Sequence, residues 1–375
     1  MLPASSNGFD RKCFEEVCAL LLDQGTRLKV VHMASEGYSK PPAEWDPNLP
    51  TLRAALDPAE LSKCLSAIAS SRWKSRLLKV IGTRLLNCHK GSRYTFEITA
   101  TTDTGWHNLI GKVYSRESFD VYDAMRKIWE GGLDNESEFA IPEPLAYIPQ
   151  LRLLLQEKVA GKLAKEVFVT GSVAERAEAA ARCGHWLMWF QALAPQQGKV
   201  MKVRKLLRRC EARLRQIVDA KVPFANKAEE LFQRLLVVSS MLEGNNWCAG
   251  HGDYSHYQIL FSGKRTVTFD WDGHDTADPC RDAARFVVSL ERLALKELTS
   301  VRDLDGAKQA FLDNYLIAKH PRFVRRLGFY RAAFFLQAAK RDVVSRNTGC
   351  LERARIMLDE GLLALDQNDG GGKNE

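Results

Sequence analysis

The feature that most constrains the fold is a change in hydrophobic periodicity near residue 160. Three runs rich in Val, Ile, Thr, Tyr and Leu, the composition of β-strands, precede it at residues 77–87, 94–100 and 107–114. Only short, turn-like segments separate these runs, so we expect them to pair as an antiparallel meander. Because 375 residues are more than one hydrophobic core usually organises, we expect two lobes.

The first of these lobes is predicted to be a small sheet with one helix over residues 77–159. A helical stretch, 117–130, follows the third strand and stops at Gly131 and Gly132. A further strand pair, at residues 146–148 and 151–159, precedes the change in pattern.

The second lobe, residues 160–365, is predicted to be large and mainly helical. Its helix from Ser172 to Leu193 begins with a capping box and ends before Pro195. A short strand hairpin at residues 258–269 interrupts the helices. The expected fold class is therefore α+β, with two lobes of different composition.

Two segments are expected to lie outside the lobes. Residues 1–76 read as a separable helical extension, with an apolar stripe at 14–22 and a second helix at 58–70 that Asp57 caps. Residues 366–375 include three consecutive glycines and are predicted to be a disordered tail.

Composition excludes several classes of protein. With 45% hydrophobic and 27% charged residues, the chain is neither disordered nor collagen-like. No stretch approaches the roughly 18 uninterrupted apolar residues of a membrane helix, and the N-terminus lacks the apolar core of a secretory signal. The nine scattered cysteines have neither CxxC pairs nor zinc-ligand spacing, which is typical of buried, reduced thiols. We therefore expect a cytoplasmic protein without a membrane partner.

Positive charge is in excess, with 54 Lys and Arg against 46 Asp and Glu and a formal net charge of +8. Such a surplus permits nucleic-acid binding without demonstrating it. The densest basic run, residues 199–209, is intermixed with apolar residues at helical spacing. We interpret it as the solvated face of an amphipathic helix, and we do not expect nucleic acid as a partner.

The densest polar cluster follows residue 250. The tripeptide His-Gly-Asp at 251–253 precedes Gln258, and the strand after the turn at Gly263 ends in Asp270. If Gly263 centres the hairpin, Asp270 falls opposite the region of His256, at the end where the tripeptide also lies. The hairpin thus brings together two carboxylates and an amide oxygen.

This arrangement suits phosphoryl transfer, a reaction that depends mainly on positioning and electrostatic stabilisation. Asp253 is placed to accept the proton of an attacking hydroxyl group. Asp270 and the side-chain oxygen of Gln258 are placed to hold Mg²⁺ against nucleotide phosphates. The spacing from Asp253 to Gln258 equals that of the aspartate and asparagine in the kinase catalytic loop.

With the runs Phe-Asp-Trp-Asp at 269–272 and Asp-Pro-Cys-Arg-Asp at 278–282, these motifs resemble the aminoglycoside phosphotransferase family, whose relatives include choline and sugar kinases. The order of elements agrees with that family over roughly residues 77–365. The resemblance implies a bilobal protein-kinase-like fold. It also implies an ATP- and Mg²⁺-dependent enzyme that phosphorylates a hydroxyl group of a small molecule.

The resemblance further assigns contacts to the nucleotide. Lys112, on the third strand, would contact its phosphates, and Ser92, in the turn after the first strand, would do so too. The backbone of Glu157 and Val159 would meet the adenine edge at the hinge. In kinases an acidic residue on the following helix pairs with the strand lysine. The helix here offers four acidic residues, and their spacing does not show which one would pair with Lys112; we choose Asp123, which lies in the middle of the helix.

Two features depart from the family pattern. The turn at residues 90–93 contains one glycine rather than a GxGxxG, and Gln258 replaces the usual asparagine. A pseudokinase or nucleotide-sensing binding protein is therefore the alternative function. A polycationic acceptor would want an acidic pocket, and we locate none beyond the catalytic aspartates, so the acceptor stays open.

Three polar residues near the site have structural interpretations. His251 is expected to brace the catalytic loop rather than transfer protons. The resemblance places Asp278 and Asp282 behind the site, where they would anchor backbone groups.

Overall fold

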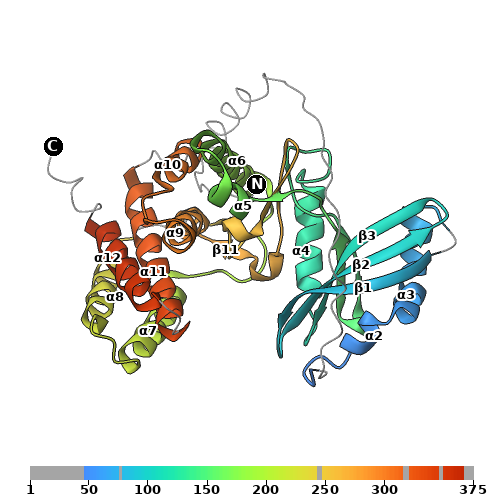
Figure 1. The fold of residues 1–375 in the computed structure, drawn as a ribbon, viewed down its shortest axis with the longest axis horizontal. Helices are drawn as coiled ribbons and strands as arrows, with labels where there is room; N and C mark the ends of the chain where they lie inside the picture. Colours follow the sequence, from blue (N-terminus) through green and yellow to red (C-terminus); the bar gives the residue numbers. More distant parts are fainter. Residues whose placement is uncertain (1–45, 76–77, 243–246, 316–320, 346–348, 367–375) are drawn as a thin grey trace, which may run out of the picture. The chain divides into compact units, whose positions relative to one another are not determined.

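The computed structural model describes residues 46–75, 78–242, 247–315, 321–345 and 349–366. The apolar stripe at 14–22 and residues 367–375 of the predicted tail lie outside these ranges. The chain forms a β-rich lobe followed by a helical lobe, as the change in periodicity predicts (Figure 1).

The β-rich lobe is built on a five-stranded antiparallel sheet. Its strand order is β1-β2-β3-β6-β5. The bounds are β1 (Leu78–His89), β2 (Arg93–Thr102), β3 (Gly105–Tyr114), β5 (Pro144–Ile148) and β6 (Leu153–Glu157). In the central strand, Lys112 pairs with Thr95 on one side and with Leu154 on the other. The meander and the later strand pair are therefore confirmed, and they join in one sheet.

Two helices ahead of the sheet share its core. They are α2 (Leu52–Leu56) and α3 (Pro58–Arg72), and the Asp57 side chain accepts hydrogen bonds from the first turn of α3. Leu61 and Leu65 pack in one cluster with Tyr94, Phe96 and other residues of the sheet. We expected residues 1–76 to be a separable extension; instead α2 and α3 share the core of the small lobe, because Leu52, Leu61 and Leu65 are buried against the sheet.

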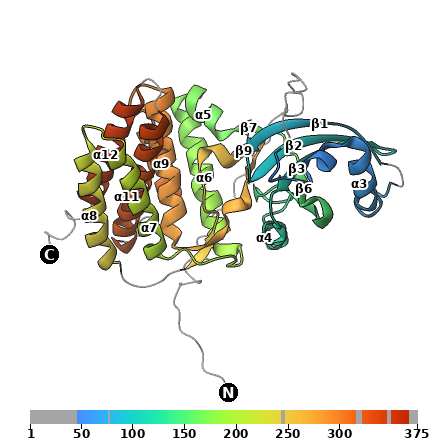
Figure 2. The same ribbon diagram turned by 90° about the horizontal axis from the view of Figure 1, so that it is seen from below.

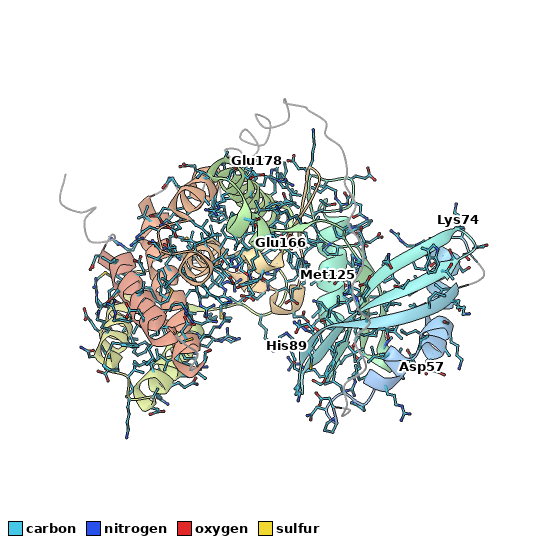
Figure 3. The ribbon with its side chains drawn as sticks, in the orientation of Figure 1. Asp57, Lys74, His89, Met125, Glu166 and Glu178 are labelled. Atoms are coloured by element: carbon cyan, nitrogen blue, oxygen red, sulfur yellow. The ribbon has the colours of Figure 1, made fainter. Side chains whose placement is uncertain are left out.

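One further helix and a short linking turn complete the small lobe. The helix is α4 (Phe119–Glu130), whose buried side includes Met125, labelled in Figure 3. The turn is η1 (Pro149–Leu151), between β5 and β6. Arg72, at the end of α3, forms an ion pair with the buried Glu143 just before β5, which ties α3 to the approach to the hinge.

The helical lobe contains eight helices among the described residues (Figure 2). They are α5 (Ala164–Thr170), α6 (Val173–Leu193), α7 (Val203–Asp219), α8 (Ala225–Ser240), α9 (Pro279–Glu297), α10 (Asp305–Asn314), α11 (Pro321–Ser345) and α12 (Cys350–Asp366). The predicted capping box between Ser172 and Glu175 is present at the start of α6. Helices α7, α8, α11 and α12 pack against one another as a group.

Short strands and single turns lie between these helices, next to the polar cluster. One small sheet has the order β4-β10-β9-β7, and a second pairs β11 with β8. The bounds are β4 (Phe139–Ala140), β7 (Lys162–Leu163), β8 (Cys248–Gly250), β9 (Ile259–Ser262), β10 (Arg265–Thr268) and β11 (Asp275–Ala277). The 3-10 turns are η2 (His256–Gln258) and η3 (Trp271–Gly273).

A stack of buried aromatic rings supports both polar loops from behind. The Trp186 ring lies 5.4 Å from that of Tyr254 and 6.0 Å from that of Trp271, measured between centroids. The Tyr254 hydroxyl donates a hydrogen bond of 2.7 Å to the carbonyl of Cys183. Because Tyr254 follows Asp253 and Trp271 follows Asp270, this core fixes the two loops that carry those carboxylates.

Within the described ranges, no helix is long and apolar enough to cross a membrane. The described cysteines are all free, as expected for thiols rather than a disulfide framework. Four of them are buried as predicted, whereas Cys64, Cys88 and Cys248 are only partly buried.

Replacing Leu65 by Ala should cost about 2–5 kcal/mol of unfolding free energy, because its side chain is fully buried against the sheet. Ser70→Ala, at an exposed position of the same helix, should change it by less than about 0.5 kcal/mol. Urea unfolding of the two variants measures the difference. Equal midpoints would show that α3 does not share the core of the small lobe.

Candidate active site

The loop of residues 251–255, predicted to be catalytic, is held from behind by a buried carboxylate and a buried imidazole. Asp282 accepts the backbone N–H groups of His251, at 2.7 Å, and Gly252, at 3.3 Å. The His251 ring takes the Asp253 N–H at Nδ1 and contacts the Phe269 carbonyl through Nε2 at 3.0 Å, so Nε2 carries the proton. Burial lowers the pKa of His251, which keeps the ring neutral and fits a bracing role.

The glycine of this loop is required by a close approach of two backbones. Gly252 has a φ of +84°, and a Cβ atom there would lie 2.0 Å from the carbonyl oxygen of Gly273. No other residue type fits this contact. The loop before β9 and the loop after β10 therefore touch through their main chains.

Asp253 is half exposed and is held at one oxygen only. Nε of Arg285, on α9, donates to Oδ1 of Asp253 at 2.8 Å, and a second guanidinium nitrogen donates to the same oxygen. The Asp253 side chain keeps 45% of its surface exposed. This arrangement orients the carboxylate and leaves Oδ2 accessible to a ligand.

Gln258 and Asp270 lie at the open end of the hairpin, whose register differs by one residue from the predicted one. Thr268 lies opposite Ile259, and the Phe269 N–H donates to the Gln258 carbonyl at 2.9 Å. Phe269 therefore lies opposite Gln258, and Asp270 is the next residue along the chain. Asp270 does not lie opposite His256. The reason is that Gly263 and Lys264 together form the turn, so Gly263 is not its centre.

A cluster of four charges joins the β3 strand to the loop after β10. Nζ of Lys112 lies 2.8 Å from Oδ1 of Asp270 and 2.8 Å from Oδ2 of Asp272. Arg93, at the start of β2, contacts the same two oxygens, with 2.9 Å to Asp270. Asp270 adopts a left-handed backbone conformation, with φ of 70°, which is a strained state for a residue other than glycine.

The charges in this cluster stabilise one another. Burial by itself would raise the pKa of Asp270, but attraction to Lys112 and Arg93 outweighs it and holds that pKa well below its usual range. Burial likewise opposes the charged form of Lys112, while Asp272 and Asp270 raise its pKa above the ordinary value. The shifts of Asp270 and Lys112 therefore both favour the charged form of each group.

Asp123 does not meet Lys112. Its carboxylate contacts Arg126 at 2.9 Å and Lys127 at 2.7 Å, one turn further along α4. Spacings of three and four residues bring such side chains together on a helix surface. The acid that we chose as the partner of Lys112 is thus used within its own helix, and Asp270 and Asp272 take that place.

Two amides of the turn between β1 and β2 are already paired within the chain. The Ser92 N–H donates to the carbonyl of His89 at 2.9 Å, and the Gly91 N–H donates to the Asp46 carboxylate at 2.5 Å. The Ser92 side chain is exposed. His89, labelled in Figure 3, marks the end of β1 where this tight turn begins. The Gly91 and Ser92 amides are thus already engaged, while the Ser92 side chain remains exposed for a contact with phosphate.

At the predicted hinge, the Glu157 N–H donates to the carbonyl of Glu143 at 2.9 Å. The Val159 N–H has no hydrogen-bond partner in the described part of the chain. Gln156 is buried, and its Oε1 also lacks a partner there. Since Leu154 pairs directly opposite Lys112, Gln156 projects from the same face of the sheet as that lysine.

Arg285 is the functional candidate that the sequence analysis missed. It belongs to a polar stripe on α9, at positions 281, 285, 289, 292 and 296, spaced three or four residues apart. The remaining positions of α9 are largely apolar and buried. A basic stripe on an otherwise apolar helix, beginning just after Asp-Pro-Cys, was the available signal.

Comparison with known proteins identifies the fold. No family model matches the sequence, and no curated protein matches it. A glucosamine kinase in complex with glucosamine, ADP and inorganic phosphate matches with a TM-score of 0.58 and 15% identity, over 84% of this chain and 89% of that chain. Aminoglycoside phosphotransferase APH(4)-Ia, a thermostable mutant in ternary complex with ADP and hygromycin B, matches with 0.54 and 13%, over 83% and 99%.

A choline/ethanolamine kinase family protein from Mesorhizobium loti matches with a TM-score of 0.51 and 15% identity, over 72% of this chain and 89% of that chain. At such identities, the likeness establishes the fold. The bilobal kinase-like architecture that the sequence predicts is therefore confirmed.

The stability of the protein should fall below pH 6.5 through His256. This ring is buried and contacts Ser289 at 3.0 Å, and burial, with nearby Lys165 and Arg285, lowers its pKa from 6.5 to about 3. Between pH 6.5 and 3, His256 binds a proton in the unfolded chain but not in the folded protein. The free energy of unfolding therefore decreases as the pH falls below 6.5.

At pH 5 this loss amounts to about 2 kcal/mol. The unfolding free energy of His256→Gln should accordingly drop less between pH 7.5 and 5, by about that amount. Urea titrations at both pH values measure it. Identical pH dependence in the two proteins would mean that His256 is not held neutral.

Proposed function

We propose that this protein is a small-molecule kinase that transfers the γ-phosphoryl group of ATP to a hydroxyl group, with Mg²⁺ as cofactor. The observation that carries the proposal is the meeting of Lys112 from the β-rich lobe with Asp270 from the helical lobe, beside a loop that presents Asp253. The shared fold with phosphotransferases that hold ADP supports it.

The nucleotide would bind between the hinge and the charge cluster. The free N–H of Val159 suits the adenine edge, and the unpaired Gln156 oxygen offers a further polar contact on the face that carries Lys112. Lys112 and Arg93 would turn from the aspartates toward the phosphates, which are the stronger anions.

The residues around Asp270 fit a Mg²⁺ site. Asp270 and Asp272 offer carboxylate oxygens and Gln258 an amide oxygen, the kind of ligand that Mg²⁺ prefers. Both cations contact the same oxygen of each aspartate, and Gln258 Oε1 accepts one hydrogen bond, from Ser255, while keeping a second lone pair. When bound, Mg²⁺ neutralises charge on the phosphates during transfer.

Asp253 would act as the proton acceptor. The acceptor hydroxyl donates its proton to Oδ2, while Arg285 holds Oδ1 and so fixes the plane of the carboxylate. The hydroxyl oxygen bonds to the γ-phosphorus as the bond to the β–γ bridging oxygen breaks, and ADP leaves with that electron pair. Lys112 counters the negative charge of the transferring group.

A nucleotide-sensing pseudokinase is the second candidate. It is favoured by the engagement of both metal-site aspartates with Lys112 and Arg93, together with glutamine at position 258. Such a protein would bind nucleotide and release it unchanged.

Replacing Asp253 by Asn should lower phosphotransfer turnover by about 100- to 10,000-fold, because the proton acceptor is lost. Nucleotide affinity should be unchanged, since the charge cluster at Asp270 is intact. Release of ADP with a panel of hydroxylated acceptors measures turnover, and titration with ADP measures affinity.

Asp103→Asn, an exposed change in the turn between β2 and β3, is the matched control and should keep full turnover. Wild-type turnover in Asp253→Asn would remove Asp253 from the mechanism. Nucleotide binding by the wild type without Asp253-dependent transfer to any acceptor would favour the pseudokinase.

A further inference from the structure

Asp253 opens onto two adjoining pockets, with volumes of about 130 and 300 Å³. Both are lined by Asp253, Arg285 and Arg341. The walls come from residues 252–258, from helices α7, α9 and α11, and from Met201, Gly273 and Asp275, and no residue of the five-stranded sheet contributes. The larger volume suits a compact small molecule.

The walls of these pockets are strongly basic. Their acids are Asp253 and Asp275, and Asp275 is already paired with the buried Arg281. The other cations that line them are Arg209, Arg213, Arg285, Arg292, Lys296 and Arg341.

Some of these cations have a carboxylate partner, and others have none among the described residues. Arg292 pairs with Asp342 at 2.7 Å, and Arg285 pairs with Asp253. Over the ranges that the structure describes, Arg213 and Arg341 form no ion pair, and Nη1 of Arg213 is buried without a hydrogen-bond partner.

The like charges act on one another. Burial lowers the pKa of Arg341, and the nearby guanidinium groups of Arg285, Arg292 and Arg213 lower it further, with Asp253 opposing them. Cations that repel one another in a partly enclosed site gain free energy when an anion joins them. Guanidinium groups also match the geometry of phosphate and carboxylate oxygens.

The nucleotide phosphates already have cations of their own, Lys112 and Arg93, in the charge cluster at Asp270. Neither Lys112 nor Arg93 lines the basic pockets, whose lining residues all belong to the helical lobe, and the smaller pocket reaches as far as Gln258. An anion there would accordingly be part of the acceptor.

We infer that the acceptor is an anionic hydroxyl compound, whose phosphate or carboxylate group binds Arg213 and Arg341 while its hydroxyl group meets Asp253. The inference rests on the proposed kinase function. This site differs from one that binds a polycation. A cationic acceptor would be repelled by these arginines, and Asp253 is the one carboxylate of the pocket lining that is not paired with Arg281.

A binding experiment without nucleotide tests the pocket in the full-length protein. At matched ionic strength, inorganic phosphate and tricarballylate are the phosphate and carboxylate probes, and neamine is the cationic probe. At least one anion should raise the unfolding temperature of the wild type, and the shift should be lost in Arg341→Gln and in Arg213→Gln.

Arg208→Gln, an exposed change on α7 outside both pockets, is the control and should keep the shift. ADP affinity should be the same in all four proteins. A shift with neamine alone, an anion shift that survives in both pocket variants, or a loss of ADP affinity in those variants would overturn the inference.

Turnover then separates this inference from the proposed function. Glucose represents a neutral acceptor and glucosamine a cationic one. Glucose 6-phosphate and gluconate represent anionic acceptors. Asp253-dependent transfer to any of them supports the kinase function. An anionic preference of about tenfold or more that Arg341→Gln abolishes supports the anionic acceptor.

Efficient transfer to glucose or glucosamine, unchanged in Arg341→Gln, would keep the kinase function and overturn the anionic acceptor. Arginine-dependent anion binding without any transfer would overturn the kinase function and, with it, the assignment of the anion as an acceptor.

Discussion

The ion cluster of Lys112 and Arg93 with Asp270 and Asp272 is the interaction on which the rest of the site depends. A lysine ammonium that is 5% exposed needs carboxylate partners, because burying an unpaired charge is costly. Lys112 comes from the middle of the sheet, and Asp270 comes from a loop that the Trp271 ring anchors in the helical core. The cluster thus joins the β-rich lobe to the helical lobe through side chains of both.

The parts of the site that sequence could predict are those determined by local spacing. The strand that carries Lys112 and the hairpin that brings Gln258 near Asp270 follow from runs of a few residues. The register of that hairpin was one residue wrong, because the turn has two residues and glycine does not mark its centre. No spacing in the sequence pointed to Asp123 as the partner of Lys112. The observed partner, Asp270, lies more than 150 residues further along the chain.

Arg285 and Arg341 illustrate what local patterns cannot provide. Each lies on a long helix, and their meeting at Asp253 depends on how α9 and α11 pack. The basic residues near 209 read as a solvated helix face, which is correct for most of α7, but that helix also turns Arg209 and Arg213 toward the pocket. A net charge of +8 describes the whole surface and gives no sign of this concentration.

The contact between Gly252 and Gly273 restricts which parts of the site can change in sequence. With two main chains touching, neither loop has room to move toward the other, and a side chain on Gly252 would push them apart. The relative placement of Asp253 and Asp270 is therefore fixed by backbone, whatever surrounds it. Variation in what the site binds would have to arise in the helices that face Asp253, where single substitutions change the charge and size of the pocket and leave the loops in place.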